Sequence, residues 1–307
     1  LRRRTRRRSA IATRYRSSCS EDFRERLPVR QATAKAYNAL RPIPANGVAM
    51  KGEAARFDLT GRVIIVTGGG TGIGKVYSQC LAQAGARVVI ADIRGEDAFR
   101  IAEELRSAGR EATALETDIT LEESTARMAA TAVKAYGRID GLVNNAGLMS
   151  QLARRPWYQI PVAEWDRVMA VNLRGMFLSC LAVYPQMKKQ QSGSIVNISS
   201  SSALEGTPGR LHYRTSKAGV IGFTRALARE LGAENIRANA LSPGMTLSDT
   251  QVASSDPAYV QKSAEGRSIP RPQVPDDLVG AAMFLLSDAS AFMTGQTLNV
   301  DGGKYML

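Results

Sequence analysis

The sequence predicts an α/β fold, in which a doubly wound parallel sheet has helices on both of its faces. Two observations carry the prediction. From about residue 59 onward, short runs rich in β-branched residues alternate with longer segments in which apolar residues recur at helical spacing. The first run leads through a glycine-rich turn into a helical segment, which is how a strand–helix–strand unit begins. Right-handed crossovers then place helices on both faces of the sheet.

Seven segments have the length and composition of buried strands, and each interval between them leaves room for a helix. They are RVIIVT (62–67), RVVIAD (87–92), EATALE (111–116), DGLVNN (140–145), SIVNIS (194–199), IRANAL (236–241) and QTLNV (296–300).

Two helices are defined clearly by the sequence. One spans residues 122–136, begins with glutamate and ends before Gly137. The other spans residues 213–231 and has an apolar face formed by Val220, Phe223, Leu227 and Leu231. The longest connection without a clear strand, at about 245–274, is rich in proline and small polar residues. We expect it to be a substrate-binding loop, because long connections in compact domains are usually lids or binding elements.

The composition is that of a globular chain. Of its 307 residues, 44% are hydrophobic, 22% charged and 6% aromatic, which excludes a mostly disordered protein. The longest apolar runs stop well short of the roughly 18 residues of a membrane-spanning helix. The cysteines, Cys19, Cys80 and Cys180, lack metal-binding spacing and favour a reducing compartment. With a single histidine, His212, neither a zinc site nor a Ser-His-Asp triad is expected.

The net charge of +13 is concentrated at the N-terminus. Residues 1–56 hold 15 Lys and Arg against 4 Asp and Glu, whereas residues 57–307 hold 26 against 24. The Arg-rich start resembles an organelle transit segment, and a basic arm could also bind nucleic acid or an anionic membrane. We prefer a third interpretation, because Met50 stands just before a clean domain start. Residues 1–55 are then an extension that is disordered or outside the functional protein, and residues 56–307 form one domain.

The turn after the first strand has the sequence TGGGTGIG (67–74). Its glycines allow close approach to a phosphate, and the helix that follows offers unpaired N–H groups and a favourable dipole to an anion. Gly69 to Gly74 with Lys75 also match most of the phosphate-binding pattern of ATPases. Val76, however, stands where that pattern has the hydroxyl that holds magnesium. The strand before the turn and the helix after it therefore favour a dinucleotide site.

Acidic residues after the next two strands bear on which dinucleotide binds. Asp92 ends the second strand, where a carboxylate accepts hydrogen bonds from the adenosine ribose hydroxyls and repels a 2′-phosphate. It favours NAD over NADP, although Arg94 could reach toward a phosphate. Asp118 follows the third strand and either binds the adenine amino group or caps the helix that begins near residue 122.

Tyr213 and Lys217 are four residues apart on a predicted helix, so both project from one face. A phenol titrates near ~10 and is a poor base at neutral pH. A nearby ammonium favours the phenolate, and lowering its pKa by ~3 units needs about 4 kcal/mol, which the lysine and a positive nicotinamide ring can supply together. Such a pair alone is common on helix surfaces, and it gains meaning from the motifs around it.

Those motifs, in this order, make the sequence similar to the classical short-chain dehydrogenase/reductase family over residues 59–303. They are TGGGTGIG (67–74), Asp92, NNAG (144–147), Asn172 in VNLRG, Ser200 in NISSS, YRTSK (213–217), SPG (242–244) and VDGG (300–303). The resemblance implies one Rossmann-type sheet of about seven strands in the order 3-2-1-4-5-6-7. It also implies an NAD-dependent oxidoreductase that interconverts a secondary alcohol and a ketone by hydride transfer.

The resemblance implies roles for individual residues. Tyr213 would be the general acid/base, Lys217 would lower the pKa of Tyr213 and hold the nicotinamide ribose, and Ser200 would bind the substrate oxygen. Asn172 would hold a water in a proton relay. The residues implied in cofactor binding are Gly68, Thr71, Gly72, Ile73, Gly74, Asp92, Ile93, Asp118, Ile119, Asn145, Ala146, Gly147, Tyr213, Lys217, Pro243, Gly244, Thr246 and Ser248.

The pocket that the resemblance implies is mostly apolar, which suits a hydrophobic or aromatic alcohol or ketone. Its residues are Leu148, Met149, Leu204, Leu211, His212 and Met245. His212 either contacts the substrate or, as we rather expect, lies on the surface at the helix start.

Three positions depart from the family pattern or are ambiguous within it. Ser248 stands where the family often has threonine, with Thr246 and Thr250 beside it. Only the spacing to Tyr213 singles out Ser200 among four consecutive serines. Thr71 occupies a position that is often basic in NADP-preferring members, which again favours NAD.

Other functions remain open at this point. Within the family the alternative is a 3-oxoacyl-thioester reductase, and outside it a P-loop phosphotransferase or a non-catalytic nucleotide- or nucleic-acid-binding protein. The segment 152–161, with two arginines and two aromatic residues, could grip an anionic substrate or acyl carrier, although such segments are more often solvated loops.

The resemblance also bears on partners and location. It implies a homotetramer or dimer built through helices 164–190 and 213–231. We expect a cytoplasmic protein without metal, membrane or nucleic-acid partners; organelle import through residues 1–50 is the less favoured alternative.

Overall fold

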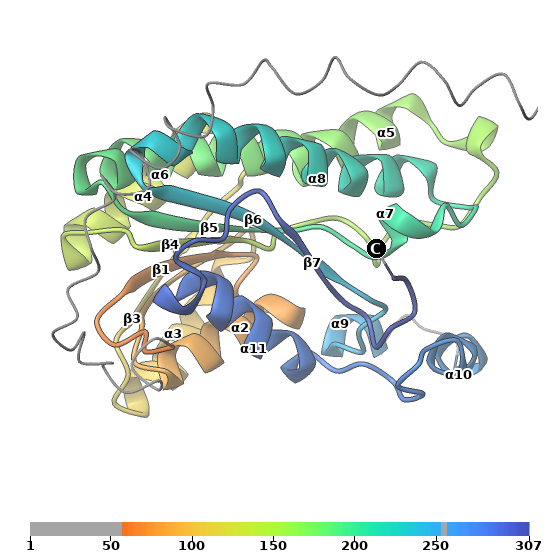
Figure 1. Ribbon diagram of the computed structural model, residues 1–307, viewed down its shortest axis with the longest axis horizontal. Helices are drawn as coiled ribbons and strands as arrows, with labels where there is room; N and C mark the ends of the chain where they lie inside the picture. The colour runs from red at the N-terminus through yellow and green to blue at the C-terminus, as the bar shows by residue number, and fades with distance from the viewer. Residues whose placement is uncertain (1–56, 253–256, 307) are drawn as a thin grey trace, which may run out of the picture. The chain divides into compact units, whose positions relative to one another are not determined.

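The computed structural model describes residues 57–252 and 257–306, with only the backbone for residues 257 and 259. The extension predicted for residues 1–55 lies outside the described residues. Seven strands form one parallel sheet in the order β3-β2-β1-β4-β5-β6-β7, which confirms the expected topology (Figure 1). They are β1 (Val63–Thr67), β2 (Arg87–Asp92), β3 (Ala112–Glu116), β4 (Gly141–Asn144), β5 (Gly193–Ile198), β6 (Ile236–Pro243) and β7 (Thr297–Val300).

The inner strands are buried on both faces, as a parallel sheet between two helix layers requires. Every residue of β1, β4 and β5 is buried, whereas β3 and β7 at the two edges are partly exposed. This two-sided burial explains the near-continuous apolar runs in the sequence. Each strand lies within two residues of its predicted range, and β6 differs most because it continues through Ser242 and Pro243.

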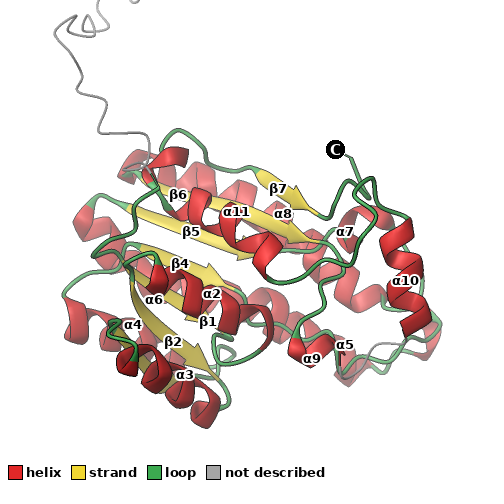
Figure 2. Cartoon of the chain, turned by 90° about the horizontal axis from the view of Figure 1, so that it is seen from below, coloured by secondary structure: helices red, strands yellow, loops and turns green. Residues whose placement is uncertain are grey.

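Helices cover both faces of the sheet, which confirms the doubly wound α/β prediction. The layer below the sheet in Figure 1, which faces the viewer in Figure 2, consists of α2 (Gly72–Gln83), α3 (Gly95–Ser107) and α11 (Asp276–Leu286). The layer above it consists of α4 (Glu122–Tyr136), α5 (Val162–Met169), α6 (Gly175–Gln190) and α8 (Leu211–Leu231). Short elements complete the fold: η2 (Trp157–Gln159), η3 (Ala170–Arg174), α7 (Ser202–Glu205), η4 (Gly232–Glu234), α9 (Asp249–Val252), α10 (Pro257–Glu265) and η5 (Asp288–Ser290).

Two hydrophobic cores lie between the sheet and these layers. Successive strand residues point to opposite faces, so Ile64 and Val66 of β1 pack with α2, α3 and α11, whereas Val63 and Ile65 pack with α4, α6 and α8. Of the face predicted for the helix 213–231, Val220 is buried in the second core, and Phe223 packs against it. With both faces covered, the ends of the strands are where the sheet can present polar groups.

The helix ends follow the sequence signals. Helix α4 has the predicted bounds, and Gly137 ends it with a φ of 76° and an N–H that donates to Val133 O at 2.8 Å. Helix α8 begins at Leu211, two residues before its predicted start.

The helical stretch Val162–Gln190 is long and apolar enough to cross a membrane by length and composition alone. Its apolar residues Val168, Met176, Val183 and Met187 are buried in the protein interior. The stretch therefore packs as a core helix against the sheet.

The segment 245–274 has more structure than the sequence indicated. Two helices, α9 and α10, form in it, and Thr246 pairs with Gln273 in an isolated parallel β-bridge that brings the two ends of the segment together. The predicted substrate-binding loop thus contains short helices at its start and middle, where the sequence shows only polar stretches. In Figure 2, α9 and α10 lie beyond the carboxyl ends of the strands.

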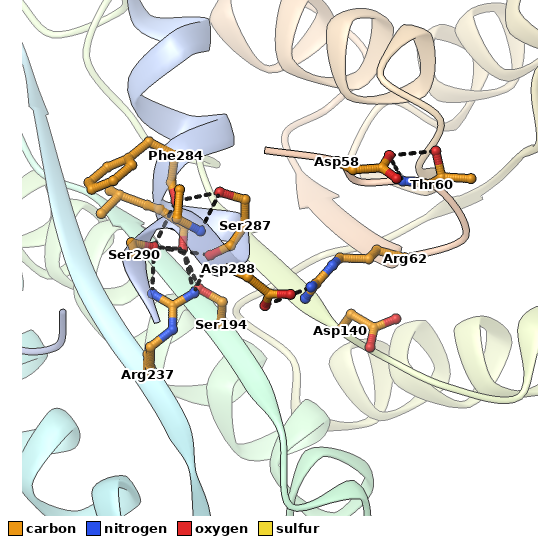
Figure 3. Close-up of polar contacts among 12 residues, drawn as sticks. Asp58, Thr60, Arg62, Asp140, Ser194, Arg237, Phe284, Ser287, Asp288 and Ser290 are labelled. Atoms are coloured by element: carbon orange, nitrogen blue, oxygen red, sulfur yellow. Dashed lines mark hydrogen bonds and ion pairs between the residues drawn. The ribbon is translucent and has the colours of Figure 1, made fainter. Parts of the chain in front are cut away.

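At the amino ends of the strands, Arg237 of β6 joins the sheet to the end of α11 (Figure 3). Its guanidinium donates to Ser290 Oγ at 2.8 Å, to Leu285 O at 2.9 Å and to Ser287 O at 3.2 Å. A cation beside these carbonyl groups satisfies acceptors that the helix end leaves unpaired and opposes the helix dipole.

Replacing Arg237 with alanine is expected to lower the free energy of unfolding by about 2–4 kcal/mol, because several partly buried acceptors lose their donor at once. Urea denaturation measures the change. Arg229→Ala is the matched control, since Arg229 is exposed in the last turn of α8, and it is expected to be nearly neutral. Equal effects of the two substitutions would contradict the role given to Arg237.

Candidate active site

The site lies at the carboxyl ends of the strands, where the glycine turn follows β1. Gly68 has a φ of +62°, and a Cβ built on it would lie 2.9 Å from Ala146 Cα. A Cβ on Gly74 would lie 1.9 Å from Gly68 O, which no side chain can tolerate. Asn145, which follows β4, holds the turn by donating from Nδ2 to Thr67 O at 3.1 Å and to Gly68 O at 3.0 Å. The turn is thus a tight cradle that admits only glycine at positions 68 and 74.

Helix α2 begins at this cradle without a side-chain cap. Thr71 occupies the N-cap position and makes no capping hydrogen bond with its side chain. Gly72, with a φ of +58°, donates its N–H to Asp249 Oδ1 of α9 at 3.0 Å. The Gly72 N–H therefore already donates to a carboxylate oxygen of the chain. A phosphate oxygen would accept a hydrogen bond at the same place in the same way. Ile73 is partly buried against the core beneath.

Asp92 is 5% exposed and is fixed by the backbone around it. Its Oδ2 accepts from Gly70 N at 2.9 Å, and its Oδ1 accepts from Arg94 N at 3.0 Å. The carboxylate thus lies beside the glycine cradle, as predicted. The Arg94 guanidinium lies close by, hydrogen-bonded to Thr71 Oγ1 and paired with Asp97 at 3.2 Å. Arg94 is therefore occupied by partners of its own chain.

Three residues predicted to bind the cofactor after β2 and β3 differ in their contacts and burial: Asp118, Ile93 and Ile119. Asp118 accepts from Thr120 N at 2.8 Å and from Thr120 Oγ1 at 2.7 Å, and α4 has Leu121 at its N-cap position, so Asp118 is not the helix cap. Ile93 is 64% exposed and free to cover a flat ring. Ile119 is buried against Gly175, so it can contribute only its backbone to a binding surface.

The four predicted catalytic residues converge. Lys217, buried in α8, donates from Nζ to Ile198 O at 2.8 Å and lies 6.0 Å from the centre of the Tyr213 ring. Asn172 is buried, accepts from Leu148 N at 2.7 Å and donates to Ser216 Oγ at 3.1 Å. A Cβ built on Gly147 would lie 3.3 Å from Asn172 Oδ1 and 3.5 Å from Lys217 Nζ. The predicted cofactor strip 145–147 therefore runs directly past the catalytic side chains.

Asn172 lies in a local irregularity that the sequence analysis did not foresee. The predicted helix 164–190 is interrupted by one π-helical turn, Ala170–Arg174, between α5 and α6. An extra residue in a helical turn re-aims its side chain, and such turns are frequent at functional sites. No residue type in the segment signals it, because its apolar spacing is compatible with a regular helix.

The structure distinguishes Ser200 from its neighbours. Ser199 is buried and donates to Lys217 O at 2.7 Å, and Ser201 is buried as well. Ser200 is only partly buried and makes a side-chain hydrogen bond with Tyr213, and its Oγ lies 2.9 Å from Ser202 Oγ. Of the three, Ser200 is the one placed beside the predicted acid/base.

Burial shapes the titration of the site. It lowers the pKa of Lys217 to about 8 and raises the pKa of Tyr213 above its usual value. The hydrogen bond with Ser200 and the positive charges of Arg210 and Arg214 act against burial at Tyr213. Contrary to the expectation from the sequence, Lys217 is not among the charges that lower the pKa of the Tyr213 phenol; the nearby cations with that effect are the two arginines.

The residues after β6 form the far wall of the site. Pro243 ends the strand, and Gly244 is held by a hydrogen bond from its N–H to Val300 O at 2.9 Å. Thr246 donates to Gly244 O at 3.1 Å, and Ser248 Oγ lies 3.1 Å from Thr250 Oγ1. Both Thr246 and Ser248 are buried, with the Ser248 hydroxyl near the glycine cradle.

The residues predicted for the substrate pocket differ in exposure, and the prediction for one of them is corrected. Leu204 and Leu211 are exposed, and Met149 and Met245 are partly buried. Both predictions for His212, as a pocket residue and as a surface residue, are wrong. Its side chain is fully buried, and Nε2 lies 3.0 Å from Glu164 Oε1 of α5. A position just before the catalytic tyrosine faces away from it on the helix, which the linear motif does not reveal. Among residues 57–252 and 257–306, no cluster of His, Cys, Asp and Glu could hold a metal ion.

Comparisons with known proteins agree with this geometry. A family model described as enoyl-(acyl carrier protein) reductase matches residues 67–304. A "probable galactose dehydrogenase" of Rhizobium meliloti is 39% identical over 81% of this chain and 96% of its own length. A 3-oxoacyl-[acyl-carrier-protein] reductase of Thermotoga maritima is 37% identical over 80% of this chain and 98% of its own length.

Solved structures are similar over the same region. A 7α-hydroxysteroid dehydrogenase in complex with NADH and 7-oxo glycochenodeoxycholic acid has a TM-score of 0.78 and 34% identity, covering 82% of this chain and 97% of its own. A 3-ketoacyl-(acyl-carrier-protein) reductase of Brucella melitensis in complex with NADH has a TM-score of 0.74 and 32% identity, covering 81% of this chain and 100% of its own. Matches of this extent show that the chain belongs to the short-chain dehydrogenase/reductase family and is an oxidoreductase of the kind that acts on CH–OH groups.

Proposed function

We propose that the protein interconverts a secondary alcohol and a ketone with NAD, using Tyr213 as the general acid/base. The observation that carries the proposal is the convergence of Tyr213, Ser200 and Lys217 beside a glycine cradle that can hold a dinucleotide. NADH formation from NAD with a panel of aliphatic, aromatic and hydroxyacyl alcohols tests it. Turnover with at least one class is expected; absence of both turnover and NADH binding would contradict the proposal.

The residues present fit a dinucleotide. Gly68, Gly72 and Gly74 have no side chain to keep a phosphate away from the backbone of the turn, and a Cβ at Gly68 or Gly74 would collide with the chain. Asp92 stands beside that cradle for the ribose hydroxyls, and Gly147 leaves room next to Lys217 for the nicotinamide ribose. When bound, NAD supplies the acceptor for the hydride.

The chain's own residues then bind the substrate and move a proton. Ser200 is placed to donate its hydroxyl hydrogen to the substrate oxygen, because it already hydrogen-bonds Tyr213. In oxidation Tyr213 takes the proton of the substrate hydroxyl; in reduction it returns one. The positive charges of Arg210 and Arg214 favour the phenolate form. Asn172 and Lys217 both lie close to Gly147. The buried Asn172 is placed to hold a water at the inner end of this path.

Asp92 supports NAD rather than NADP as the working cofactor. Its buried carboxylate would lie against a 2′-phosphate, and like charges at that range repel. Arg94, the residue that could have attracted the phosphate, is held by Asp97 and Thr71.

Replacing Asp92 with alanine is expected to reduce the preference for NAD over NADP by about 10- to 100-fold in kcat/KM, since the repulsion and the ribose hydrogen bonds disappear together. Steady-state kinetics with both cofactors measures the ratio. Glu103→Ala is the control, because it removes an exposed carboxylate of α3 that pairs with Arg106 and leaves the Arg94–Asp97 pair intact. An unchanged ratio in Asp92→Ala would exclude the role of Asp92 in cofactor choice.

A 3-oxoacyl-thioester reductase is the second candidate, favoured by the similarity to the Thermotoga enzyme. The two candidates differ in their substrates, which the hydroxyacyl members of the panel separate. The partly apolar wall of Met149, Leu204, Leu211 and Met245 suits a hydrophobic or aromatic substrate in either case.

We also propose that two copies of the chain associate through α5, α6 and α8. A shallow apolar groove there is lined by Met169, Leu173, Phe177 and Phe223. Phe177 is 48% exposed and meets the partly buried Phe223 ring edge-on at 6.5 Å, so aromatic surface of α6 faces outward beside α8. A second copy presenting the same face would bury it, and a further pairing would give a tetramer.

Phe177→Glu is expected to convert the oligomer to a smaller species, because it places a charge in the apolar face. Light scattering after gel filtration measures the mass. Phe99→Glu, at an exposed position of α3, is the control and should leave the mass unchanged. A monomeric wild-type chain, or an unchanged mass in Phe177→Glu, would contradict the proposed interface.

A further inference from the structure

A chain of three charged or polar side chains connects the segment after β4 to the first turn of α8. Arg155 donates from Nη2 to Glu164 Oε2 at 3.2 Å, and the other oxygen of the same carboxylate, Oε1, lies 3.0 Å from His212 Nε2. The histidine Nε2 carries the hydrogen of this bond, because its partner is a carboxylate. The three residues come from three elements: the loop before η2, helix α5 and helix α8.

The same loop is fastened to the turn before α8 at a second place. Arg155 N donates to Gly209 O at 3.0 Å, and Arg210 donates from Nε to Leu152 O at 2.7 Å. The Arg210 guanidinium also lies 3.6 Å from the sulfur of Met149, a residue of the predicted substrate pocket. The loop at 149–155 and the start of α8 therefore form one connected wall of the site.

The start of α8 needs such support. Arg210 stands at its N-cap position and makes no side-chain capping bond, and the first turn contains no acidic residue. An uncapped first turn leaves N–H groups unpaired and frays readily. Tyr213 is the third residue of this helix, so it lies within the turn that would fray. The fully buried His212 anchors this turn to α5, because its side chain pairs with Glu164 of that helix.

We propose that His212 is a positioning residue for Tyr213, and that Arg155, Glu164 and His212 together hold the acid/base and the adjoining substrate loop in one fixed arrangement. The inference rests on the proposed function, because it assigns Tyr213 the proton transfer. It gives a role to the one histidine of the chain and to one arginine of the segment 152–161 that the family motifs leave without one.

Amide hydrogen exchange tests the anchoring without relying on activity. In His212→Leu the amides of residues 213–217 are expected to exchange at least about tenfold faster, because a charge-assisted hydrogen bond is lost, whereas residues 220–231 keep their rates. His212→Gln should restore slow exchange, since its amide nitrogen can donate where Nε2 did. Glu230→Gln, an exposed substitution on the same helix, is the control. Unchanged exchange in His212→Leu, or a uniform increase along α8, would overturn the inference.

Kinetics tests the consequence for the reaction. His212→Leu and Glu164→Gln are expected to lower kcat by about 10- to 100-fold with little change in the KM for NAD, because the glycine cradle is untouched. His212→Gln should recover most of the loss. A fully retained kcat, or a loss that His212→Gln does not rescue, would contradict positioning. If the wild-type chain shows no turnover with NAD, the proposed function fails, and the exchange rates still decide the inference.

A separate measurement tests whether Arg155 acts together with Glu164 and His212. Because His212 is the only histidine among the 307 residues, its ring nitrogen signals in an NMR spectrum of untagged protein are unambiguous. Glu164→Gln and Arg155→Met should both shift the Nε2 signal, since the first removes the negative charge beside Nε2 and the second removes the cation paired with the same carboxylate. A shift with Glu164→Gln and none with Arg155→Met would remove Arg155 from the chain.

Discussion

Replacing Tyr213 with phenylalanine is expected to lower kcat by about 10²- to 10⁴-fold, the usual contribution of a positioned general acid/base. The phenol oxygen is the only group lost, and the aromatic ring keeps its packing at the start of α8. NADH binding should persist, because the glycine cradle after β1 and Asp92 at the end of β2 are left unchanged. Steady-state rates and a fluorescence titration with NADH measure the two effects separately.

Tyr136→Phe is the matched control, since it removes a half-buried phenol of α4 that lies away from the site. It should keep the wild-type kcat. In the wild type, the rate of alcohol oxidation is expected to rise toward alkaline pH, because burial raises the pKa of Tyr213 and the base must first lose its proton. Retained turnover in Tyr213→Phe would show that another group moves the proton.

Gly74→Ala is expected to weaken NADH binding by about 100-fold or more, because the new methyl group would displace the cradle by an ångström or more. A Cβ at this position would lie 1.9 Å from Gly68 O and 2.5 Å from Asn145 Nδ2. The loop must open to relieve these contacts, and its N–H groups then no longer converge on a phosphate. A fluorescence or calorimetric titration with NADH measures the loss.

Gly222→Ala separates this effect from the general cost of replacing a glycine. A Cβ on Gly222, which is exposed on α8, meets no atom within 4 Å, so this variant should bind NADH normally and gain roughly 0.5–1 kcal/mol of stability. Normal NADH binding by a folded Gly74→Ala protein would exclude the cradle as the cofactor site.

The sheet could be predicted from the sequence because its strands are buried on two faces. The central residues of runs such as 62–67 and 87–92 are apolar because both faces of these strands are buried, which is typical of a parallel sheet between helices. The end of α4 was predictable for a local reason, since Gly137 is needed where φ is positive. The helices α9 and α10 escaped prediction because short polar segments carry no clear periodicity.

The four candidate catalytic residues could be predicted together because they belong to motifs at fixed spacing. The contacts around them could not be predicted. Nothing local in the sequence indicates that Glu164 lies beside His212, or that Asp249 binds Gly72 across 177 positions. Such contacts depend on how helices pack, which is decided by tertiary structure. The π-helical turn that carries Asn172 escaped prediction for the same reason.

Several expectations from the sequence stay predictions. They are the assignment of residues 1–55 as an extension and of residues 56–307 as the functional domain, the role of about 245–274 in substrate binding, and the cytoplasmic location. The individual cofactor contacts after β3 and β6 also stay predictions, among them Asp118, Ile119, Thr246 and Ser248.

The central claim is that hydride passes directly between a CH–OH carbon and NAD at the Tyr213 site. The most direct test uses an alcohol that turns over, labelled with deuterium at its carbinol carbon, and locates the label in the products by NMR. We expect the deuterium on the nicotinamide ring of the reduced cofactor, with a ketone as the other product. Deuterium released to the solvent, with the nicotinamide unlabelled, would contradict it.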